Sequence, residues 1–388
     1  MRKILHVDLD AFFCSVEELL DPSLKDKAFA TGGTSDGRGV VTSCSYAARL
    51  YGVHSAMPMR KAMRMCPNLI TVRGHYEYYS RYSKRVVDIL QNITPQVEQI
   101  SIDEAFLDVS DLPQAPKIIA LDLQMKIRRE TGLPCSIGAA SNKLVAKIAT
   151  NIGKSDHKKP TPPMAIKVIP PGKEKSFLKT LPIREMWGIG PKSEKLLQDF
   201  GIVSIGSIQR IQIEKLEKIL GSFAYTLKRR ALGIDNRQVG NDESVKSISN
   251  ERTFFDNLIK KNEIYSVIKD LSEKVGQRLR KRGLSGRTIR LKIRWPNFDT
   301  ITRQLTLNQP TNHDSVIFSS VKNLLEKVWV EGKRVRLVGV GVSKLESDIH
   351  QPSLFNRDFE KEKMLLEAMD DLQERFGKEI IHKGSGRK

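Results

Sequence analysis

Short hydrophobic runs alternate with amphipathic segments over the first 150 residues. Residues 4–10 form an apolar run that ends in aspartates, which predicts a buried strand with carboxylates at its C-terminal end. Residues 12–20 carry hydrophobic side chains at helical spacing, and Asp21-Pro22 predicts the end of this helix. Similar patterns predict strands at 99–102, 105–109 and 135–139, helices at 46–51, 59–65 and 118–130, and a polar loop at 31–38. Alternating strands and helices predict an α/β layer.

The second half of the chain has a different pattern. Residues 181–205 predict helices joined by a tight glycine turn, and the polar segment 233–244 predicts a linker. The predicted elements that follow are strand, helix, strand, strand, helix and strand, at 248–254, 264–279, 288–295, 300–307, 316–328 and 335–343. This is the βαββαβ order of a split βαβ domain. A charged helix is predicted from 358 to 376.

Positive charge is concentrated in one part of the sequence. The 388 residues include 65 Lys and Arg against 45 Asp and Glu, a formal net charge of +20. Residues 245–346 hold 21 basic and 10 acidic side chains, whereas the tail 347–388 holds 8 and 9. Such a surplus favours a polyanionic partner, either nucleic acid or an anionic membrane.

Membrane and zinc signals are weak. The sequence contains no run of about 20 apolar residues, and the N-terminus becomes acidic at Asp8 before a signal-like run forms. The four cysteines form no Cys-x-x-Cys pair, which argues against zinc and for a reducing compartment. We therefore expect a cytoplasmic protein that binds nucleic acid and no membrane.

Three carboxylates, those of Asp8, Asp103 and Glu104, occur where predicted apolar strands end. A cluster of acids at a sheet edge needs counter-charge, because an unpaired buried carboxylate is costly. Mg²⁺ supplies such charge, binding one or two carboxylates per ion together with substrate phosphates. The spacing alone also fits ordinary strand-end acids.

Four segments resemble, in order, the motifs of the Y family of low-fidelity, lesion-bypassing DNA polymerases, most nearly the bacterial DNA polymerase IV branch. Residues 8–17 resemble the first motif. The other motifs are matched by residues 46–49 with 52–53 and 56–58, by 101–109, and by 136–138 with 142–149. The likeness extends from about residue 2 to 346, and the ordered set is far more specific than any single motif.

The resemblance implies the roles of the acids. Asp8 and Asp103 would bridge two Mg²⁺ ions, with Mn²⁺ as a possible substitute. Glu104 would bind the catalytic ion beside the primer hydroxyl, and the backbone carbonyl of Leu9 would complete the nucleotide-side ion. The reaction implied is attack of a primer 3′-oxygen on the α-phosphorus of a paired dNTP.

The resemblance also implies a nucleotide site. Phe13 would be the steric gate that leaves no space for a 2′-hydroxyl, with Phe12 beside it. Tyr46 and Arg49 share a helix face and would bind the triphosphate, with a hydroxyl contact from Ser43.

Two lysines are candidates for the triphosphate contact, because the chain departs from the family pattern after the fourth motif. The family has Lys-Pro-Asn-Gly there, whereas this chain has a longer basic segment at 153–163. Counting from residues 146–149 selects Lys154, and Lys159, directly before Pro160, is the rival.

Two segments imply contacts with DNA. Gly188, Gly190 and Lys192 resemble a helix-hairpin-helix, in which glycines and a helix start bring backbone N–H groups close to phosphate. The basic βαββαβ unit resembles the family's little finger. Its strands are predicted to carry a set of basic residues, only part of which can face one DNA: Lys246, Arg252, Arg290, Lys292, Arg294, Arg334 and Arg336.

The tail holds a candidate protein-binding motif. Gln351, Leu354 and Phe355 lie in a segment that resembles the sliding-clamp peptide of polymerases. Leu and Phe would fill an apolar pocket and Gln would meet its polar rim.

The implied architecture is an α/β multidomain right hand. It comprises a palm (1–10 and 75–165), small fingers (11–74), a helical thumb (166–232), a linker (233–244), a ferredoxin-like little finger (245–346) and a clamp-binding tail (347–388). The partners implied are primed template DNA, dNTPs and a sliding clamp, with the protein a monomer.

Two other classes of protein fit part of the pattern. A non-catalytic DNA- and clamp-binding protein derived from a polymerase should have lost metal carboxylates, whereas all three are present. An RNA-binding protein with a ferredoxin-like sheet should show stacking aromatics, which the last domain lacks. The sequence therefore favours the polymerase.

Overall fold

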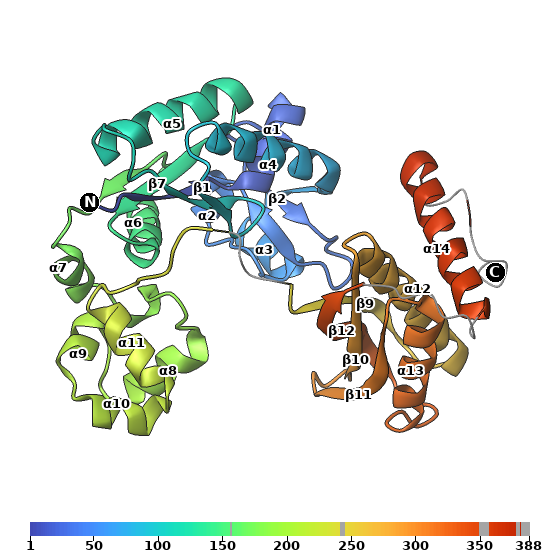
Figure 1. Ribbon diagram of the computed structural model, residues 1–388. Coiled ribbons are helices and arrows are strands. Elements are labelled where there is room, and N and C mark those ends of the chain that lie inside the picture. The colour runs from blue at the N-terminus through green and yellow to red at the C-terminus, as the bar shows by residue number, and fades with distance from the viewer. Residues whose placement is uncertain (156, 241–244, 349–356, 378–380, 382–388) are drawn as a thin grey trace. The chain divides into compact units, whose positions relative to one another are not determined.

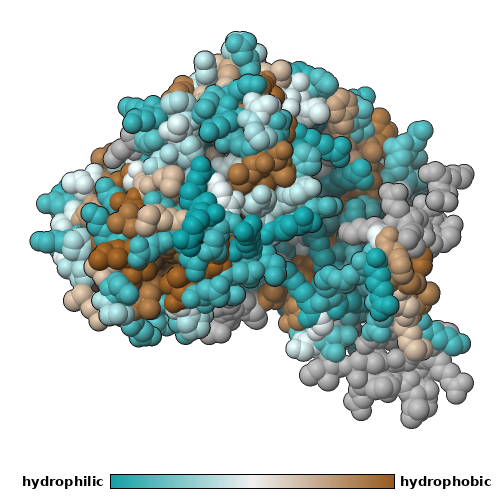
Figure 2. Space-filling model, turned by 90° about the horizontal axis from the view of Figure 1, so that it is seen from above, coloured by the Kyte–Doolittle hydropathy of each residue, from teal (hydrophilic) through white to brown (hydrophobic). Residues whose placement is uncertain are grey.

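A computed structural model describes residues 1–155, 157–240, 245–348, 357–377 and 381 (Figure 1). The chain separates into two compact units, residues 1–242 and 243–388. Figure 2 shows that hydrophilic residues predominate on the face seen from above, where hydrophobic residues gather in a few patches. No helix of the described residues is both long enough and apolar enough to cross a bilayer.

The first unit is built around a five-stranded sheet with the order β5-β6-β1-β7-β8. Its central strand β1 pairs antiparallel with both β6 and β7. Apolar side chains from alternate positions of β1 pack against opposite layers. The strands are β1 (Ile4–Leu9), β5 (Val97–Gln99), β6 (Glu104–Asp108), β7 (Cys135–Ala140) and β8 (Ile166–Val168). The predicted α/β layer is confirmed, with Glu104 inside a strand instead of in the turn before it.

Helices cover both faces of this sheet (Figure 1). Leu5, Val7 and Leu9 share a core with α1 (Phe12–Leu20), α4 (Tyr76–Gln91) and α5 (Pro116–Thr131). On the other face, Ile4 and Phe106 pack with α6 (Lys143–Ser155). Helices therefore pack on both faces of the sheet.

A small satellite sheet follows α1. Its order is β3-β2-β4, and it has its own compact apolar core. The elements are a 3₁₀ turn (Pro22–Leu24), β2 (Phe29–Gly32), β3 (Val41–Cys44), α2 (Tyr46–Arg49), α3 (Met59–Met65) and β4 (Ile70–Val72). The loop predicted to begin at residue 31 therefore begins two residues later, because Thr31 and Gly32 pair with β3.

Residues 174–231 form short helices around the same apolar cluster that α6 joins. They are α7 (Glu174–Lys179), a 3₁₀ turn (Ile183–Glu185), α8 (Pro191–Asp199), α9 (Ile205–Arg210), α10 (Ile213–Leu220) and α11 (Phe223–Ala231). The predicted helical region is confirmed, although a single 3₁₀ turn precedes the glycine hairpin where a helix was predicted.

The polar segment predicted as a linker is bound to the sheet layer over residues 233–240. Asp235 Oδ2 accepts from the Leu144 backbone N–H at the start of α6 (3.1 Å). Lys143 Nζ donates to the Gln238 carbonyl (3.0 Å), and the Gly240 N–H donates to Glu98 (3.2 Å). Polar groups of this segment therefore attach it to the neighbouring sheet layer.

The second unit is a four-stranded antiparallel sheet with the order β11-β10-β12-β9 and two helices on one face. Each helical crossover skips one strand, which is the split βαβ arrangement. The elements are β9 (Ser247–Leu258), α12 (Lys261–Arg280), β10 (Leu284–Arg294), β11 (Thr300–Thr311), α13 (Asp314–Glu326) and β12 (Val335–Ser347). The predicted ferredoxin-like order is confirmed.

The predicted tail helix is α14 (Arg357–Phe376; Figure 1), and ion pairs join it to the C-terminal end of α12. The buried guanidinium of Arg280 pairs with Asp370 (2.6 Å) and also with Asp314 at the start of α13 (2.8 Å). Lys281 pairs with Glu374 (2.6 Å). Because Arg280 has a second acid, it stays neutralised even when α14 is absent.

Candidate active site

Strand pairing brings the three predicted acids to one edge of the central sheet. Asp8 on β1 lies directly opposite Glu104 on β6 in the antiparallel register. The Leu9 N–H donates to the Asp103 carbonyl (3.0 Å), so the residue before Glu104 is fixed beside the end of β1. Asp8 and Glu104, which are 96 positions apart along the sequence, therefore converge as the predicted site requires.

Each acid has a polar partner that neutralises or orients it. Lys147 Nζ lies 2.6 Å from Glu104 Oε2, and Ser101 Oγ donates to Asp103 Oδ1 (2.5 Å). Lys154 Nζ lies 2.7 Å from Asp8 Oδ1. Both lysines are on α6, seven residues and two turns apart, so they face the acidic edge together.

Asp10 was missed as a site residue by sequence reasoning. Its carboxylate is fully buried, lies 3.1 Å from Lys154 Nζ and accepts from Ser136 Oγ (2.9 Å) and the Met164 N–H (3.1 Å). The acid therefore fixes Lys154 beside Asp8. The sequence feature that could have identified Asp10 is its place as the second aspartate of the Asp8-Leu9-Asp10 run.

The electrostatics of the edge are dominated by crowded carboxylates. Burial, with repulsion from Asp8 and Asp103, raises the pKa of Glu104 even though Lys147 acts in the opposite direction. Burial acts to lower the pKa of Lys154, but the carboxylates of Asp8 and Asp10 outweigh it and the pKa is raised. The site therefore favours positive charge.

This donor set fits hard divalent cations, which prefer carboxylate and carbonyl oxygens. Among the described residues, however, no three acidic, His or Cys side chains already stand together as a cation cage. Two ammonium groups and a hydroxyl each contact one oxygen of these carboxylates. The residues therefore fit the ions provided that these partners give way.

The predicted triphosphate residues lie beside this edge. The Arg49 guanidinium stacks over the Tyr46 ring (4.5 Å) and its Nε donates to the Cys44 carbonyl (3.3 Å). The buried Tyr46 hydroxyl has no hydrogen-bond partner within the described part of the chain. Burial and then Asp10 raise the pKa of Tyr46, which keeps this hydroxyl a donor. Ser43, at the neighbouring β3, is also buried.

The predicted gate residue is supported by an aromatic platform. The half-buried Phe13 ring stacks on Tyr79 with 4.3 Å between centroids and 18° between planes. The Tyr79 hydroxyl donates to the buried carboxylate of Glu17, which also lies 2.9 Å from His75 Nδ1. Phe12, in contrast, is 2 % exposed and packs in the core, so its side chain faces away from the site.

Lys154 and Lys159 occupy different surroundings. Lys154 is held at the acidic edge, whereas Lys159 is exposed in a loop after α6. The loop contacts the site through His157, whose ring packs edge-on against Tyr46 (6.0 Å). The geometry favours Lys154.

Comparison with known proteins identifies relatives that match nearly the whole chain. Residues 7–151 match the impB/mucB/samB family, residues 245–354 match that family's C-terminal domain, and residues 171–202 match the IMS family HHH motif. A DNA polymerase IV of Dehalococcoides mccartyi (strain CBDB1) is 37% identical over 99% of this chain and 97% of that protein. The chain belongs to the Y family of DNA polymerases.

Other members and solved structures agree. A DNA polymerase IV of Desulfatibacillum aliphaticivorans is 37% identical over 96% of this chain and 94% of that protein. A Y-family DNA polymerase chimera, Dbh-Dpo4(243-245)-Dbh, covers 88% of this chain and 98% of its own, with 27% identity and a TM-score of 0.77. The insertion ternary complex of Dbh DNA polymerase has 26% identity and a TM-score of 0.63. The resemblance inferred from the four motifs is thus confirmed.

The glycine hairpin of this Y-family polymerase lies within the matched HHH motif. Gly188 has φ of +99°, and an added Cβ would lie 3.2 Å from Arg230 Nη1. Gly190 caps α8, has open space where a Cβ would be, and precedes Pro191 and the exposed Lys192. Backbone N–H groups at this helix start are therefore accessible to an anion.

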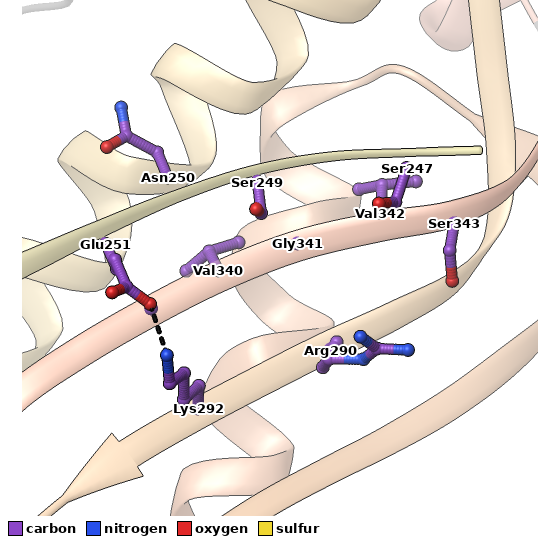
Figure 3. A pocket seen from close by; sticks show the side chains of 11 residues that line it. Ser247, Ser249, Asn250, Glu251, Arg290, Lys292, Val340, Gly341, Val342 and Ser343 are labelled. Carbon is purple, nitrogen blue, oxygen red and sulfur yellow. Dashed lines mark hydrogen bonds and ion pairs between the residues drawn. The ribbon is translucent and has the colours of Figure 1, made fainter. Parts of the chain in front are cut away.

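The open face of the second unit's sheet forms a polar trough along β12 (Figure 3). Gly339 and Gly341 form its floor, where an added Cβ would lie 3.1 Å from the side chains of Glu251 and Ser249. Arg290 and Lys292 of β10 line one side, and Lys292 pairs with Glu251 (2.6 Å). The Y-family polymerase thus presents cations along a groove that has no bulky side chain at its floor.

Only part of the predicted basic set shares this open face. Arg290, Lys292 and Arg294 alternate with the core residues of β10 and point away from the helices. Arg252 pairs in register with the core residue Val338, and so lies on the face that the helices cover. Lys246 and Arg334 precede their strands, and Arg336 stacks on Phe298 (4.3 Å).

Proposed function

We propose that this chain extends a primer by template-directed transfer of dNTPs, with the low fidelity and lesion bypass of the Y family. The observation that carries the proposal is the convergence of Asp8, Asp103 and Glu104 on one sheet edge opposite two lysines. Its relatives are DNA polymerases IV over nearly their whole length.

We propose that the divalent cations are two Mg²⁺ ions, with Mn²⁺ able to substitute. Asp8 and Asp103 would bind both, Glu104 the catalytic ion, and the Leu9 carbonyl the nucleotide-side ion. When bound, such ions lower the pKa of a primer hydroxyl and neutralise charge on the phosphates.

The chain's own residues bind and orient the nucleotide. Lys154, Arg49 and Tyr46 supply charge and donors to the triphosphate, and Ser43 adds a hydroxyl. The Phe13 ring, fixed by Tyr79, excludes a 2′-hydroxyl. Phe12 supports this site through its backbone, because its side chain lies in the core.

Primer extension tests the proposal directly. Purified protein with primed template, dNTPs and Mg²⁺ should lengthen the primer by template-directed additions. Binding to primed DNA without any addition would instead support the non-catalytic accessory protein. Comparing Mg²⁺ with chelator in the same assay separates metal-dependent synthesis from a contaminating activity.

Replacing Lys154 by alanine should raise the KM for dNTP by about tenfold or more, since a charge-assisted contact with phosphate is lost. Lys159→Ala is the matched control and should change the KM by less than about twofold, because that side chain is exposed. Steady-state incorporation of a single nucleotide measures both. The reverse ranking would assign the triphosphate to Lys159.

The hairpin and the open sheet face are proposed to hold the DNA backbone. Gly188, Gly190 and Lys192 would bind phosphates through backbone N–H groups and an ammonium. Arg290→Ala should lower DNA affinity and reduce the slope of log K against log salt by about one. Arg252→Ala, on the covered face of the same sheet, should leave the slope unchanged. Equal slopes for both variants and the parent protein would show that the open sheet face is not part of the DNA interface.

We further propose that the protein works in the cytoplasm as a monomer and docks on a sliding clamp. The domain limits proposed are 1–10 and 75–165 for the palm, 11–74 for the fingers, 166–232 for the thumb, 233–244 for the linker, 245–346 for the little finger and 347–388 for the tail. The clamp residues Gln351, Leu354 and Phe355 lie outside the described residues.

Replacing both Leu354 and Phe355 by alanine should abolish stimulation by the clamp while basal extension stays within about twofold, because these side chains are the proposed anchors. Substitution is a sharper test than truncation after residue 345, since truncation would also shorten β12 and remove α14 from α12. Extension on circular primed DNA with and without clamp gives the answer. Undiminished stimulation would contradict the motif.

A further inference from the structure

Lys147 is not among the residues proposed to bind the nucleotide, yet it neutralises the acid proposed to bind the catalytic ion. Its Nζ lies 2.6 Å from Glu104 Oε2 and 5.7 Å from the centre of the Trp187 ring. Trp187 directly precedes the glycine hairpin, and its other cation contact is the Arg237 guanidinium at 4.6 Å. One ammonium thus touches both a metal-binding acid and the base of the hairpin.

The two lysines on α6 differ in the acidic partners that they keep once Asp8 and Glu104 bind ions. Lys154 contacts Asp8 and also the fully buried Asp10, so it keeps a carboxylate when Asp8 turns to a cation. Lys147 has Glu104 alone as its acidic partner within 4.0 Å in the described residues. Beyond Glu104, its ring contact is Trp187.

An ammonium and a divalent cation that contact the same Glu104 oxygen repel each other strongly. Mg²⁺ binds carboxylate oxygen at about 2.0–2.1 Å. At such separations its double charge attracts the carboxylate more strongly than the single charge of an ammonium does. An ion that binds Glu104 Oε2 would therefore displace Lys147 Nζ, which lies 2.6 Å from that oxygen. The Trp187 face lies within cation–π range of Lys147 Nζ and attracts a displaced ammonium.

We propose that Lys147 is a positioning residue that holds the place of the catalytic ion and moves from Glu104 to Trp187 when that ion binds. This inference rests on the proposed ligand role of Glu104. Lys147 then sets the affinity for the catalytic ion by competition. It also couples ion loading to Trp187, whose carbonyl accepts from Arg230 of α11 (3.1 Å) at the start of the hairpin.

Direct Mn²⁺ binding tests the competition without relying on turnover. Mn²⁺ is titrated by electron paramagnetic resonance into full-length protein with primed DNA that ends in a dideoxynucleotide and a paired dNTP. Lys147→Met should bind the more weakly held Mn²⁺ several-fold to about tenfold tighter, whereas Lys147→Arg should resemble the parent. Lys143 lies on the same helix as Lys147 and forms a comparable ion pair with Glu98 of β5. Lys143→Met should leave Mn²⁺ affinity unchanged. Unchanged or weaker Mn²⁺ binding in Lys147→Met overturns the proposal.

Indole fluorescence tests the movement. The chain has three tryptophans, and replacing Trp295 and Trp329 by phenylalanine leaves Trp187 as the reporter. Mn²⁺ quenches directly, so Mg²⁺ is used here. Mg²⁺ loading should change Trp187 emission in this background and in its Lys147→Arg form, and the change should vanish with Lys147→Met. A change that persists in Lys147→Met contradicts a moving ammonium.

A Glu104→Gln variant separates this inference from the function on which it rests. If Glu104→Gln retains both Mn²⁺ ions with parental affinity, Glu104 is no ligand and the proposed site itself is wrong. If it loses one ion while Lys147→Met binds as the parent does, the site stands and the place-holding role is wrong. Thermal unfolding adds a check on folding, since Lys147→Met should be less stable without ions and should gain more from them than the parent.

Discussion

Replacing Asp103 by alanine should lower nucleotide incorporation by about a thousandfold or more while DNA affinity stays within about twofold. The side chain lies at the turn before β6, where its oxygen accepts from Ser101 and the adjacent Glu104 faces Asp8. Removing one of three carboxylates removes several kcal/mol of stabilisation of transition-state charge. Asp103 is only partly buried, so the fold should survive.

Single-turnover incorporation and DNA binding by anisotropy measure the two effects. Asp108→Asn is the matched control, because Asp108 lies at the far end of β6 and contacts Ser110 and Arg2. It should incorporate nucleotides at nearly the parental rate. A normal rate in Asp103→Ala would exclude Asp103 as a metal ligand and undermine the proposed chemistry.

Replacing Phe13 by alanine should reduce discrimination against ribonucleotides by about a hundredfold or more. The ring is half-buried and rests on Tyr79, so it is rigid enough to collide with a 2′-hydroxyl. Without it, a space larger than a hydroxyl group opens beside the sugar. The ratio of kcat/KM for a dNTP to that for the matching rNTP measures the change.

Tyr79→Phe serves as the control for this gate. It keeps the aromatic platform and loses only the hydroxyl that donates to Glu17, which His75 still contacts. Discrimination should therefore stay within a few-fold of the parent. Unchanged sugar selectivity in Phe13→Ala would assign the gate to another residue, whatever Tyr79→Phe does.

The sequence predicted the elements whose patterns arise from local physics. The run ending at Asp8 is apolar because its residues are buried in the centre of a sheet, and the helix of residues 59–65 has the predicted bounds. By contrast, α4 was not predicted. Its buried stripe consists partly of Tyr79 and Ser83, which hydropathy counts as weak or polar. Their burial follows from contacts with Glu17 and the Ile102 carbonyl, which are distant in sequence.

The sequence by itself determined the family, because a motif keeps residue types and spacing that can be seen without coordinates. It also predicted an order of domains and the identity of the acids. Tertiary structure decided which charges meet: the β1–β6 register sets Asp8 opposite Glu104, and α6 brings Lys154 and Lys147 to them. It also showed that Phe12 faces the core and that residues 233–240 are fastened to the sheet layer. Such pairings depend on distances of a few ångströms between remote segments, and only the packing of helices and strands sets those distances.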